Sequence, residues 1–441
     1  EFKIEREAQD KMALHSQLRA VAAQKAGHLA REITPVTIQQ KKGDAIVVDK
    51  DEHPRETSLE ALAKLKGVVR PDGTVTAGHA RGVNDGACAP LLADAQAFQS
   101  SEAERQLLLD PAVGGVILFR RNFENVAQLK ALVAEIKALR TPELIIAVDH
   151  EGGRVQRFIE GFTRLPAMNV LGEMWDEKGV AAAKAAAEQA GWVPAVEFTA
   201  CGIDLSVTPV LGVNWGQCSV IGNRSCHQSA ESVAALARAL QKGLSKGGIK
   251  ACGKHFPGHG FVEGDSHHVL PQDNRSLAEL EAADIVPFCK LSAEGMAAVM
   301  PAHVVYPQID AQPAGFSEVW LKQILRHKIG FNGVIFSDDL TMEGACGAGG
   351  IKARAQLSFD AGCDIVLVCN RPDLVDELRN GFAAPANPDL AARWQYMANT
   401  LRPSDAAAMM DTPEFKAAQA VVAALATPKD IASGVKVGEA F

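Results

Sequence analysis

The sequence predicts an α/β protein whose main part is a (β/α)8 barrel of the TIM type, preceded by an extra N-terminal segment. From about residue 90, short apolar runs alternate with amphipathic helical patterns. Such alternation is typical of a parallel sheet covered by helices. Charged residues and histidines follow the predicted strands, as they do at the functional face of a barrel. A doubly wound open sheet is the alternative arrangement.

The predicted strands are short runs of apolar and β-branched residues, each followed by polar or turn-forming residues. Seven such runs are clear, at 116–119, 144–148, 204–209, 249–252, 298–300, 334–336 and 365–368. A weaker run at 90–94 is the candidate for the eighth strand, which would close the barrel.

Helical patterns lie between these strands. Residues 126–139 carry apolar side chains at helical spacing. A second helix is predicted at 229–246, ending at two glycines, and a third begins at Ser276 with Glu279 three residues later, as in a capping box. The alanine-rich residues 386–441 are predicted to form a C-terminal helical extension, to which we assign no function.

Composition narrows the possible partners. Of the 441 residues 47% are hydrophobic and 22% are charged, with a net charge of −8 and no long basic run. Nucleic acid and anionic membranes are therefore not expected as partners. No apolar run is long enough to span a membrane, and the first residues are too charged for a signal peptide. Nine cysteines without a C-x-x-C pair fit a reducing compartment, so we expect a cytoplasmic protein.

Residues 1–89 differ from the rest. They are rich in Lys, Glu and Asp, with a helix expected at 7–32 and a glycine-rich passage at 74–89. This passage resembles an internal piece of the thiolases, with departures at His79 and Arg81. The thiolase nucleophile segment has no counterpart, so we expect a fragment without an active site. A piece cut from a larger fold lacks part of its own core, and we expect it to be poorly ordered or loosely docked.

The most concentrated polar segment is Lys-His-Phe-Pro-Gly-His-Gly at 254–260, followed by Asp-Ser-His-His at 265–268. Proline and glycines do not continue a helix, so these side chains are expected on a loop leaving the strand 249–252. His255 and His259 have the i, i+4 spacing of a metal pair. Because Pro257 and Gly258 break the helix that such a pair needs, we predict no metal site.

Other predicted strands end in similar residues. The segments are Ala-Val-Asp-His-Glu-Gly-Gly-Arg-Val-Gln-Arg at 147–157, Ile-Gly-Asn-Arg-Ser at 221–225, Met-Pro-Ala-His at 300–303 and Ser-Asp-Asp-Leu at 337–340. Because the carboxyl ends of parallel strands meet at one face of a barrel, we expect these groups to form one site.

These motifs, with Gly-Val-Ile-Phe-Ser-Asp-Asp-Leu-Thr-Met-Glu-Gly-Ala at 333–345, resemble the family 3 glycoside hydrolases. Within that family, the sequence is most similar to the bacterial cytoplasmic β-N-acetylglucosaminidases of peptidoglycan recycling, over residues 90–385. The resemblance implies a retaining hydrolase that removes terminal GlcNAc from GlcNAc–1,6-anhydro-MurNAc, with or without its peptide. It implies a small muropeptide or amino-sugar disaccharide as substrate, no cofactor, and a monomer.

The resemblance also implies residue roles. The nucleophile is Asp338, the proton donor and acceptor is His267, and Asp265 orients His267. The sugar-binding positions of the family match Asp149, Arg157, Arg224, Lys254 and His255.

These roles are chemically reasonable. A retaining glycosidase needs a carboxylate nucleophile and a proton shuttle about 5 Å apart. A histidine, with an ordinary pKa near 6.5, suits proton transfer at neutral pH, and a nearby carboxylate fixes its tautomer. The residues alone do not separate Asp338 from Asp339 as nucleophile. Glu151 is a candidate structural partner at a strand end, and His268 is assigned no role.

Two departures from the family pattern lie near the expected pocket, Gly212 in place of Asp and Cys226 in place of an aromatic residue, so we expect altered sugar affinity. Two alternatives stay open. One is a β-N-acetylglucosaminide phosphorylase of the same family, because a histidine acid/base does not repel phosphate. The other is an inactive barrel that only binds sugar.

Overall fold

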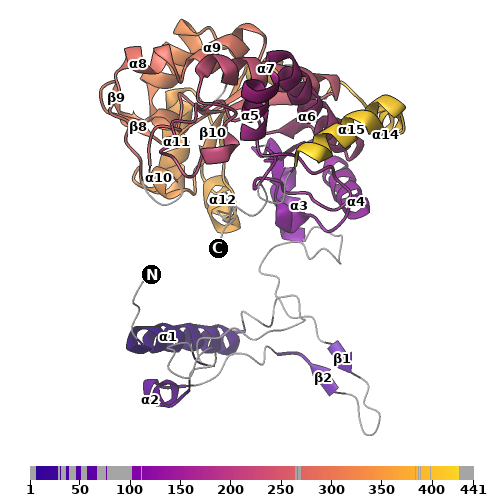
Figure 1. The fold of residues 1–441 in the computed structure, drawn as a ribbon. Coiled ribbons are helices and arrows are strands. Elements are labelled where there is room, and N and C mark those ends of the chain that lie inside the picture. Colours follow the sequence, from indigo (N-terminus) through magenta and orange to yellow (C-terminus); the bar gives the residue numbers. More distant parts are fainter. Residues whose placement is uncertain are drawn as a thin grey trace. The chain divides into compact units, whose positions relative to one another are not determined.

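The computed structural model describes residues 6–27, 30, 36–38, 46–50, 57–66, 76, 102–110, 112–263, 266, 270–382, 384, 385, 387, 389–397 and 399–426. The chain divides into two compact units, Glu1–Cys88 and Ala89–Phe441 (Figure 1). The site described below lies within the second unit.

The first unit contains a helix, a short second helix and a two-stranded antiparallel ribbon. The elements are α1 (Arg6–Lys25), β1 (Val36–Ile38), β2 (Ile46–Val48) and α2 (Leu59–Ala63). Arg6 forms an ion pair with Asp10 and donates to the backbone carbonyls of Leu62 and Leu65, which joins α1 to the end of α2. The helix expected at 7–32 corresponds to α1 in its first part only, because α1 ends at Lys25 and a turn follows at residues 26–27. The weak packing expected for this segment stays a prediction.

The second unit is built on a parallel sheet, in which the described part has seven strands in the order β11-β10-β7-β6-β5-β4-β3. The strands are β3 (Gly115–Leu118), β4 (Ile145–Val148), β5 (Leu205–Ser206), β6 (Lys250–Phe256), β7 (Ala298–Pro301), β10 (Val334–Asp339) and β11 (Ile365–Leu367). Each predicted strand from 116 onward corresponds to one of them, which confirms the α/β class with a parallel sheet. The candidate strand at 90–94 lies outside the described residues, and β3 and β11 are the edges of the described sheet.

The structure corrects the extent of three strands. The run expected at 204–209 forms a strand only at Leu205–Ser206, and two other strands are longer than expected. The chain was expected to leave the sheet after residue 252, but β6 continues through Lys254 and His255 to Phe256. Neighbouring β7 supplies the reason, because Lys254 pairs with Met300 in parallel register and the pairing holds the chain extended. In the same way β10 runs on to Asp339, beyond the predicted end at residue 336.

Helices cover the sheet, and the local signals for their starts are confirmed. Ser229 caps one helix through the amide of Ser232, and Ser276 with Glu279 forms the predicted capping box. The α-helices of this unit are α3 (Glu102–Leu109), α4 (Val126–Lys137), α5 (Asn169–Lys178), α6 (Val180–Ala200), α7 (Ala230–Lys246), α8 (Leu277–Ala282), α9 (Val286–Ala293), α10 (Glu343–Cys346), α11 (Ile351–Ala361), α12 (Pro372–Arg379), α13 (Leu390–Met397), α14 (Pro403–Met410) and α15 (Pro413–Leu425).

Several shorter or irregular elements connect them. A two-stranded antiparallel ribbon, β8 (Val305–Tyr306) with β9 (Asp310–Pro313), follows β7. A π-helix occupies Val319–Lys328, and 3₁₀ turns occupy Arg120–Asn122, Gly222–Arg224 and Ala314–Phe316.

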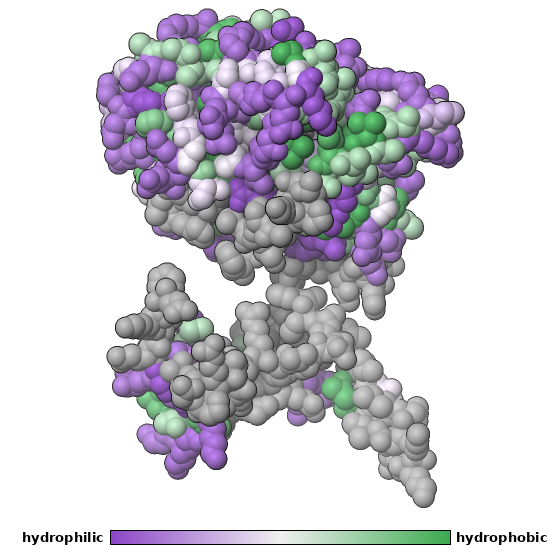
Figure 2. Space-filling view, viewed as in Figure 1, coloured by the Kyte–Doolittle hydropathy of each residue, from purple (hydrophilic) through white to green (hydrophobic). Residues whose placement is uncertain are grey.

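The C-terminal helices belong to the same body as the sheet. Figure 1 shows α14 and α15 alongside α6, and the Phe415 ring lies edge-on to Trp192 with their centroids 5.7 Å apart. Figure 2 shows a largely polar face interrupted by an apolar patch in the region of α15. Among the described residues, no helix has both the length and the apolar character needed to cross a bilayer.

Candidate functional site

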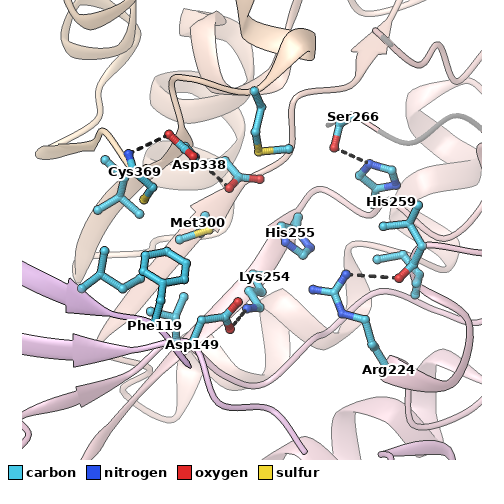
Figure 3. A pocket seen from close by; sticks show the side chains of 17 residues that line it. Phe119, Asp149, Arg224, Lys254, His255, His259, Ser266, Met300, Asp338 and Cys369 are labelled. Atoms are coloured by element: carbon cyan, nitrogen blue, oxygen red, sulfur yellow. Dashed lines mark hydrogen bonds and ion pairs between the residues drawn. The ribbon is translucent and has the colours of Figure 1, made fainter. Parts of the chain in front are cut away.

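A pocket lies at the carboxyl ends of the parallel strands, where the sequence predicts it (Figure 3). Strands β3, β6, β7, β10 and β11, the residue that follows β4, and the 3₁₀ turn after β5 each contribute side chains. The lining residues are Ile117, Phe119, Asp149, Val207, Val220, Ile221, Arg224, Lys254, His255, His259, Ser266, Met300, Asp338, Asp339, Met342, Leu367 and Cys369.

An ion network forms one side of this pocket. The Lys254 ammonium lies 2.5 Å from Asp149 Oδ1 and 2.6 Å from Glu151 Oε1. Arg224 donates through Nε and Nη2 to the two oxygens of Glu151, both at 2.8 Å. Glu151 therefore holds the two cations that come from β6 and from the turn after β5. The interpretation of Glu151 as a structural partner agrees with this geometry.

The network stays ionised although it is buried. The side chains of Glu151, Lys254 and Arg224 are only 1%, 2% and 4% exposed. Burial by itself raises the pKa of a carboxyl, but Arg224 and Lys254 outweigh it and hold the pKa of Glu151 below its ordinary value. Burial likewise opposes the charge on Lys254, while Asp149 and Glu151 raise its pKa. Pairing on this scale is what allows charges to remain inside a protein.

Arg157 lies behind Asp149. Its Nε donates to the Asp149 carbonyl at 3.1 Å and its Nη2 to Asp149 Oδ2 at 3.3 Å, with the guanidinium 5.5 Å from the centre of the Phe119 ring. Arg157 is not among the residues that line the pocket. These contacts orient the Asp149 carboxylate, so Arg157 acts on the pocket through its neighbour.

Two glycines bring Asp149 and Glu151 into place. Gly152 and Gly153 have φ angles of +111° and +54°, a region that side chains rarely adopt. A Cβ on Gly152 would lie 2.4 Å from the Pro166 carbonyl oxygen. The turn is therefore tight, and it folds the chain back directly after the two carboxylates.

His255 presents a neutral imidazole to the pocket. Burial lowers the pKa of His255 well below its ordinary value, and the nearby Asp338 offsets this only in part. Its Nδ1 is buried without a hydrogen-bond partner among the described residues. A neutral ring with an unused nitrogen is suited to exchange a hydrogen bond with a ligand hydroxyl.

Asp338 and Asp339 are adjacent but differently held. The Asp339 carboxylate accepts from the Thr341 amide and hydroxyl at 2.9 and 2.8 Å and from the Cys369 amide at 3.0 Å. Burial raises the pKa of Asp339 in spite of these bonds. Asp338 accepts the Asp339 amide through Oδ1 at 2.8 Å. Figure 3 shows Asp338 on the side of the pocket that also holds His255.

Asp265, His267 and His268 lie outside the described residues. Ser266, between the two proposed catalytic groups, is described and is buried beside the pocket. Its Oγ is 3.1 Å from His259 Nε2. The position of the acid/base pair therefore stays a prediction.

Sequence reasoning missed the apolar part of the site. Phe119, Met300, Met342 and Cys369 line the pocket. Phe119 directly follows β3 and Met300 lies near the end of β7, so the position at a strand end, which identified the polar residues, could have identified these two as well. Conversely, neither Gly212 nor Cys226 is a lining residue, and the Cys226 side chain belongs to the apolar core. In the described ranges, no group of three or more His, Cys, Asp or Glu is arranged to hold a metal ion.

Comparison with protein families decides what kind of site this is. Residues 83–387 match the model of the glycosyl hydrolase family 3 N-terminal domain. The chain belongs to glycosyl hydrolase family 3. It is therefore a glycoside hydrolase, as the motifs at 147–157, 254–268 and 333–345 indicated.

The chain matches named relatives over nearly the whole length of those relatives. A protein named β-hexosaminidase from Neisseria meningitidis is 75% identical over 352 residues, which are 80% of this chain and 98% of the relative. One from Chromobacterium violaceum is 59% identical over 80% of this chain and 98% of its own. The crystal structure of NagZ from Neisseria gonorrhoeae in complex with N-trifluoroacetyl-D-glucosamine is 72% identical with a TM-score of 0.72, covering 75% of this chain and 96% of that one.

A second family model matches the N-terminal region. Residues 1–96 match the thiolase N-terminal domain, which confirms the resemblance seen in the sequence. The two matches overlap at 83–96. The family 3 relatives account for 80% of the chain, so the thiolase-like part is additional to a family 3 domain.

Proposed function

We propose that the chain is a retaining β-N-acetylglucosaminidase that hydrolyses terminal β-linked GlcNAc from GlcNAc–1,6-anhydro-MurNAc, with or without its peptide. The observation that carries the proposal is Asp338 at the end of β10, in a pocket whose other side is the ion network of Asp149, Glu151, Lys254 and Arg224. The β-hexosaminidase name of the 75% identical relative and the amino sugar bound to the gonococcal structure support the substrate class.

The first step forms a covalent glycosyl-enzyme. The Asp338 carboxylate attacks the anomeric carbon while the bond from that carbon to the leaving oxygen breaks. His267 gives its proton to the leaving oxygen, and Asp265 stabilises the imidazolium before that transfer.

The second step releases the sugar. Neutral His267 removes a proton from water, the water oxygen bonds to the anomeric carbon, and the ester bond to Asp338 breaks. The enzyme returns to its starting state, and the two displacements retain the anomeric configuration.

The described groups provide what sugar hydroxyls need. Asp149 is an acceptor, Lys254 and Arg224 are donors, and His255 has an unused nitrogen. Lys254 and Arg224 are already held by carboxylates, so they bind in fixed positions and lose little freedom when the sugar arrives.

The hydrogen bonds of the two aspartates favour Asp338 as the nucleophile. The Asp339 carboxylate is occupied by donors from Thr341 and Cys369, which tie β10 to the segment after β11. Its role in our proposal is to fix the strand end that carries Asp338.

The phosphorylase alternative is less well supported. In the described site, Asp149 pairs with Arg157 and Lys254, and Glu151 pairs with Lys254 and Arg224. The carboxylates of Asp338 and Asp339 also line the pocket. This balance leaves no excess positive charge for phosphate. Turnover of 4-nitrophenyl GlcNAc with and without phosphate distinguishes the two reactions, because a phosphorylase would yield the sugar 1-phosphate.

Trapping the intermediate tests the nucleophile directly. A 2-acetamido-fluorosugar should label the peptide that carries β10, and fragmentation should place the sugar on Asp338. Asp338→Asn should lower turnover at least about a thousandfold, whereas Asp360→Asn, an exposed side chain on α11, should leave it unchanged. A label on Asp339, or full activity in Asp338→Asn, contradicts the assignment. A wild-type chain that binds sugar without turnover supports the inactive alternative.

His267 is tested by the leaving group. His267→Ala should retain turnover of substrates whose leaving group departs without a proton, such as 2,4-dinitrophenyl GlcNAc, and lose turnover of the natural disaccharide.

We further propose a thiolase-like segment at 1–89, a (β/α)8 barrel at 90–385 and a helical extension at 386–441. A cavity of about 1040 Å³, lined by Val116 and Ile117 of β3 and by Ile365 and Val366 of β11, supports an eighth strand between these edges. We also propose that the protein is a cytoplasmic monomer that acts in cell-wall recycling, as its resemblance to the peptidoglycan-recycling enzymes of the family implies.

A further inference from the structure

Two hydrogen bonds hold Ser266, which lies in the sequence between Asp265 and His267, the proposed acid/base pair. Its Oγ lies 3.1 Å from His259 Nε2, and its carbonyl oxygen accepts the Gly344 amide at 2.9 Å. The Ser266 residue is only 3% exposed. Figure 3 shows the contact with His259 at the edge of the pocket, across from Asp338.

His259 is in turn held by its surroundings. Its ring is buried, with Nδ1 3.7 Å from the Cys218 sulfur and its centroid 6.1 Å from that of His255. The residue before it is anchored by Tyr306, whose hydroxyl donates to the Gly258 carbonyl. These contacts therefore hold the His259 ring with Nε2 toward Ser266. They give a role to a histidine for which we propose neither metal binding nor sugar binding.

Gly344 provides the second contact and connects it to the nucleophile strand. It lies in α10, five residues after the end of β10, and a Cβ added to it would lie 3.0 Å from the Ser266 carbonyl oxygen and 3.1 Å from His303 Cβ. His303 Nε2 is 3.1 Å from the Asp339 carbonyl oxygen. The close approach therefore depends on glycine, and Gly344 together with the adjacent His303 links Ser266 to the end of β10.

We propose that His259 and Gly344 are positioning residues, which hold Ser266 and through it set the placement of Asp265 and His267 relative to Asp338. Consecutive Cα atoms are about 3.8 Å apart, so fixing Ser266 restricts where its two neighbours can lie. Misplacement of a catalytic group by about 1 Å can cost about 100-fold in rate. The inference rests on the proposed roles of Asp265, His267 and Asp338.

The test compares leaving groups. Ser266→Ala removes only the hydroxyl that faces His259. For phenyl GlcNAc, whose poor leaving group needs a proton, kcat/KM should fall by about 10- to 100-fold. For 2,4-dinitrophenyl GlcNAc, which needs none, it should fall less than about threefold. Azide should accelerate release of the trapped sugar in the variant, because an anionic nucleophile needs no general base.

Matched variants separate positioning from stability. Gly344→Ala should give the same divergence between the two substrates, because its Cβ displaces the Ser266 carbonyl. His259→Gln should recover part of the loss seen in His259→Leu, since the amide can still bond Ser266. Ser232→Ala, which alters a buried serine on α7, should leave the ratio of the two rates at the wild-type value.

The outcomes are distinct. The positioning role is wrong if Ser266→Ala and Gly344→Ala keep the wild-type ratio of the rates on the two substrates. It is also wrong if both rates fall by the same factor and the melting temperature falls with them. If Ser266→Ala does not fold, the ratio of kcat/KM for phenyl GlcNAc to that for 2,4-dinitrophenyl GlcNAc is measured for Gly344→Ala, and a wild-type ratio in that variant rules out the positioning role. If the wild-type chain releases GlcNAc from neither substrate, the proposed function itself has failed.

Discussion

Replacing Glu151 by glutamine removes the one carboxylate that Lys254 and Arg224 share while keeping the side chain's shape. Glu151 accepts Arg224 at both oxygens and Lys254 at one, and all three side chains are buried. In Glu151→Gln, an amide NH₂ replaces one acceptor and faces cationic donors. Lys254 keeps Asp149 as a partner, whereas Arg224 loses its paired carboxylate.

The size of the effect follows from the burial. Removing one partner of a buried ion pair costs about 3–5 kcal/mol, because the remaining charge stays out of water. With an unfolding entropy of about 2.1 cal/mol/K per residue, the unit Ala89–Phe441 changes its melting temperature by about 4–7 °C for that free energy.

The matched control is Glu188→Gln, which breaks the surface pair with Lys242. Such exposed pairs contribute about 0–1 kcal/mol, so the melting temperature should change by about 1 °C or less. Both variants are measured by scanning calorimetry at pH 7. A Glu151→Gln melting temperature no lower than that of Glu188→Gln would refute the reasoning.

The pH dependence gives a second check. The pKa of Glu151 is depressed in the folded chain, so its contribution to stability is present above the ordinary value of 4.5 and is lost as pH falls through the folded pKa. The difference between wild type and Glu151→Gln should therefore be complete at pH 7 and narrow below about pH 4.5. A difference that is constant from pH 7 to pH 3 would contradict this.

Three further predictions concern other parts of the chain. Burial raises the pKa of Glu197 to about 7, so its contribution to stability is present below pH 4.5 and is lost as pH rises through 7. Glu197→Gln should flatten that decline and be more stable than wild type at pH 8 by up to about 3 kcal/mol in urea unfolding. Phe415→Ala should cost about 3–5 kcal/mol, because the ring is buried against Trp192; an unchanged melting temperature would mean that α15 does not stabilise the fold. The purified chain should not transfer acetyl groups from acetyl-CoA, and a rate above a blank without enzyme would show that residues 1–89 retain thiolase chemistry.

Much of the fold could be predicted because its signals are local. The apolar runs at 116–119, 298–300 and 334–336 each fall within one residue of a strand start, and Ser276 with Glu279 forms the capping box that their spacing indicates. Strand ends were less predictable. The pairing of Lys254 with Met300 extends β6 through a Lys-His pair that by composition suggests a loop.

The sequence by itself determined the class of fold, the family and the identity of the polar residues at the strand ends, because these depend on short patterns along the chain. Only the tertiary structure decided how those residues are used. Glu151 meets Arg224 and Lys254 from 73 and 103 residues away, and Gly344 meets Ser266 from 78. Such contacts arise from how strands and turns pack around one centre, and no local pattern records which donor will face which acceptor. For the same reason Asp338 and Asp339, equivalent in sequence, are distinguished only by the partners that surround them in the folded chain.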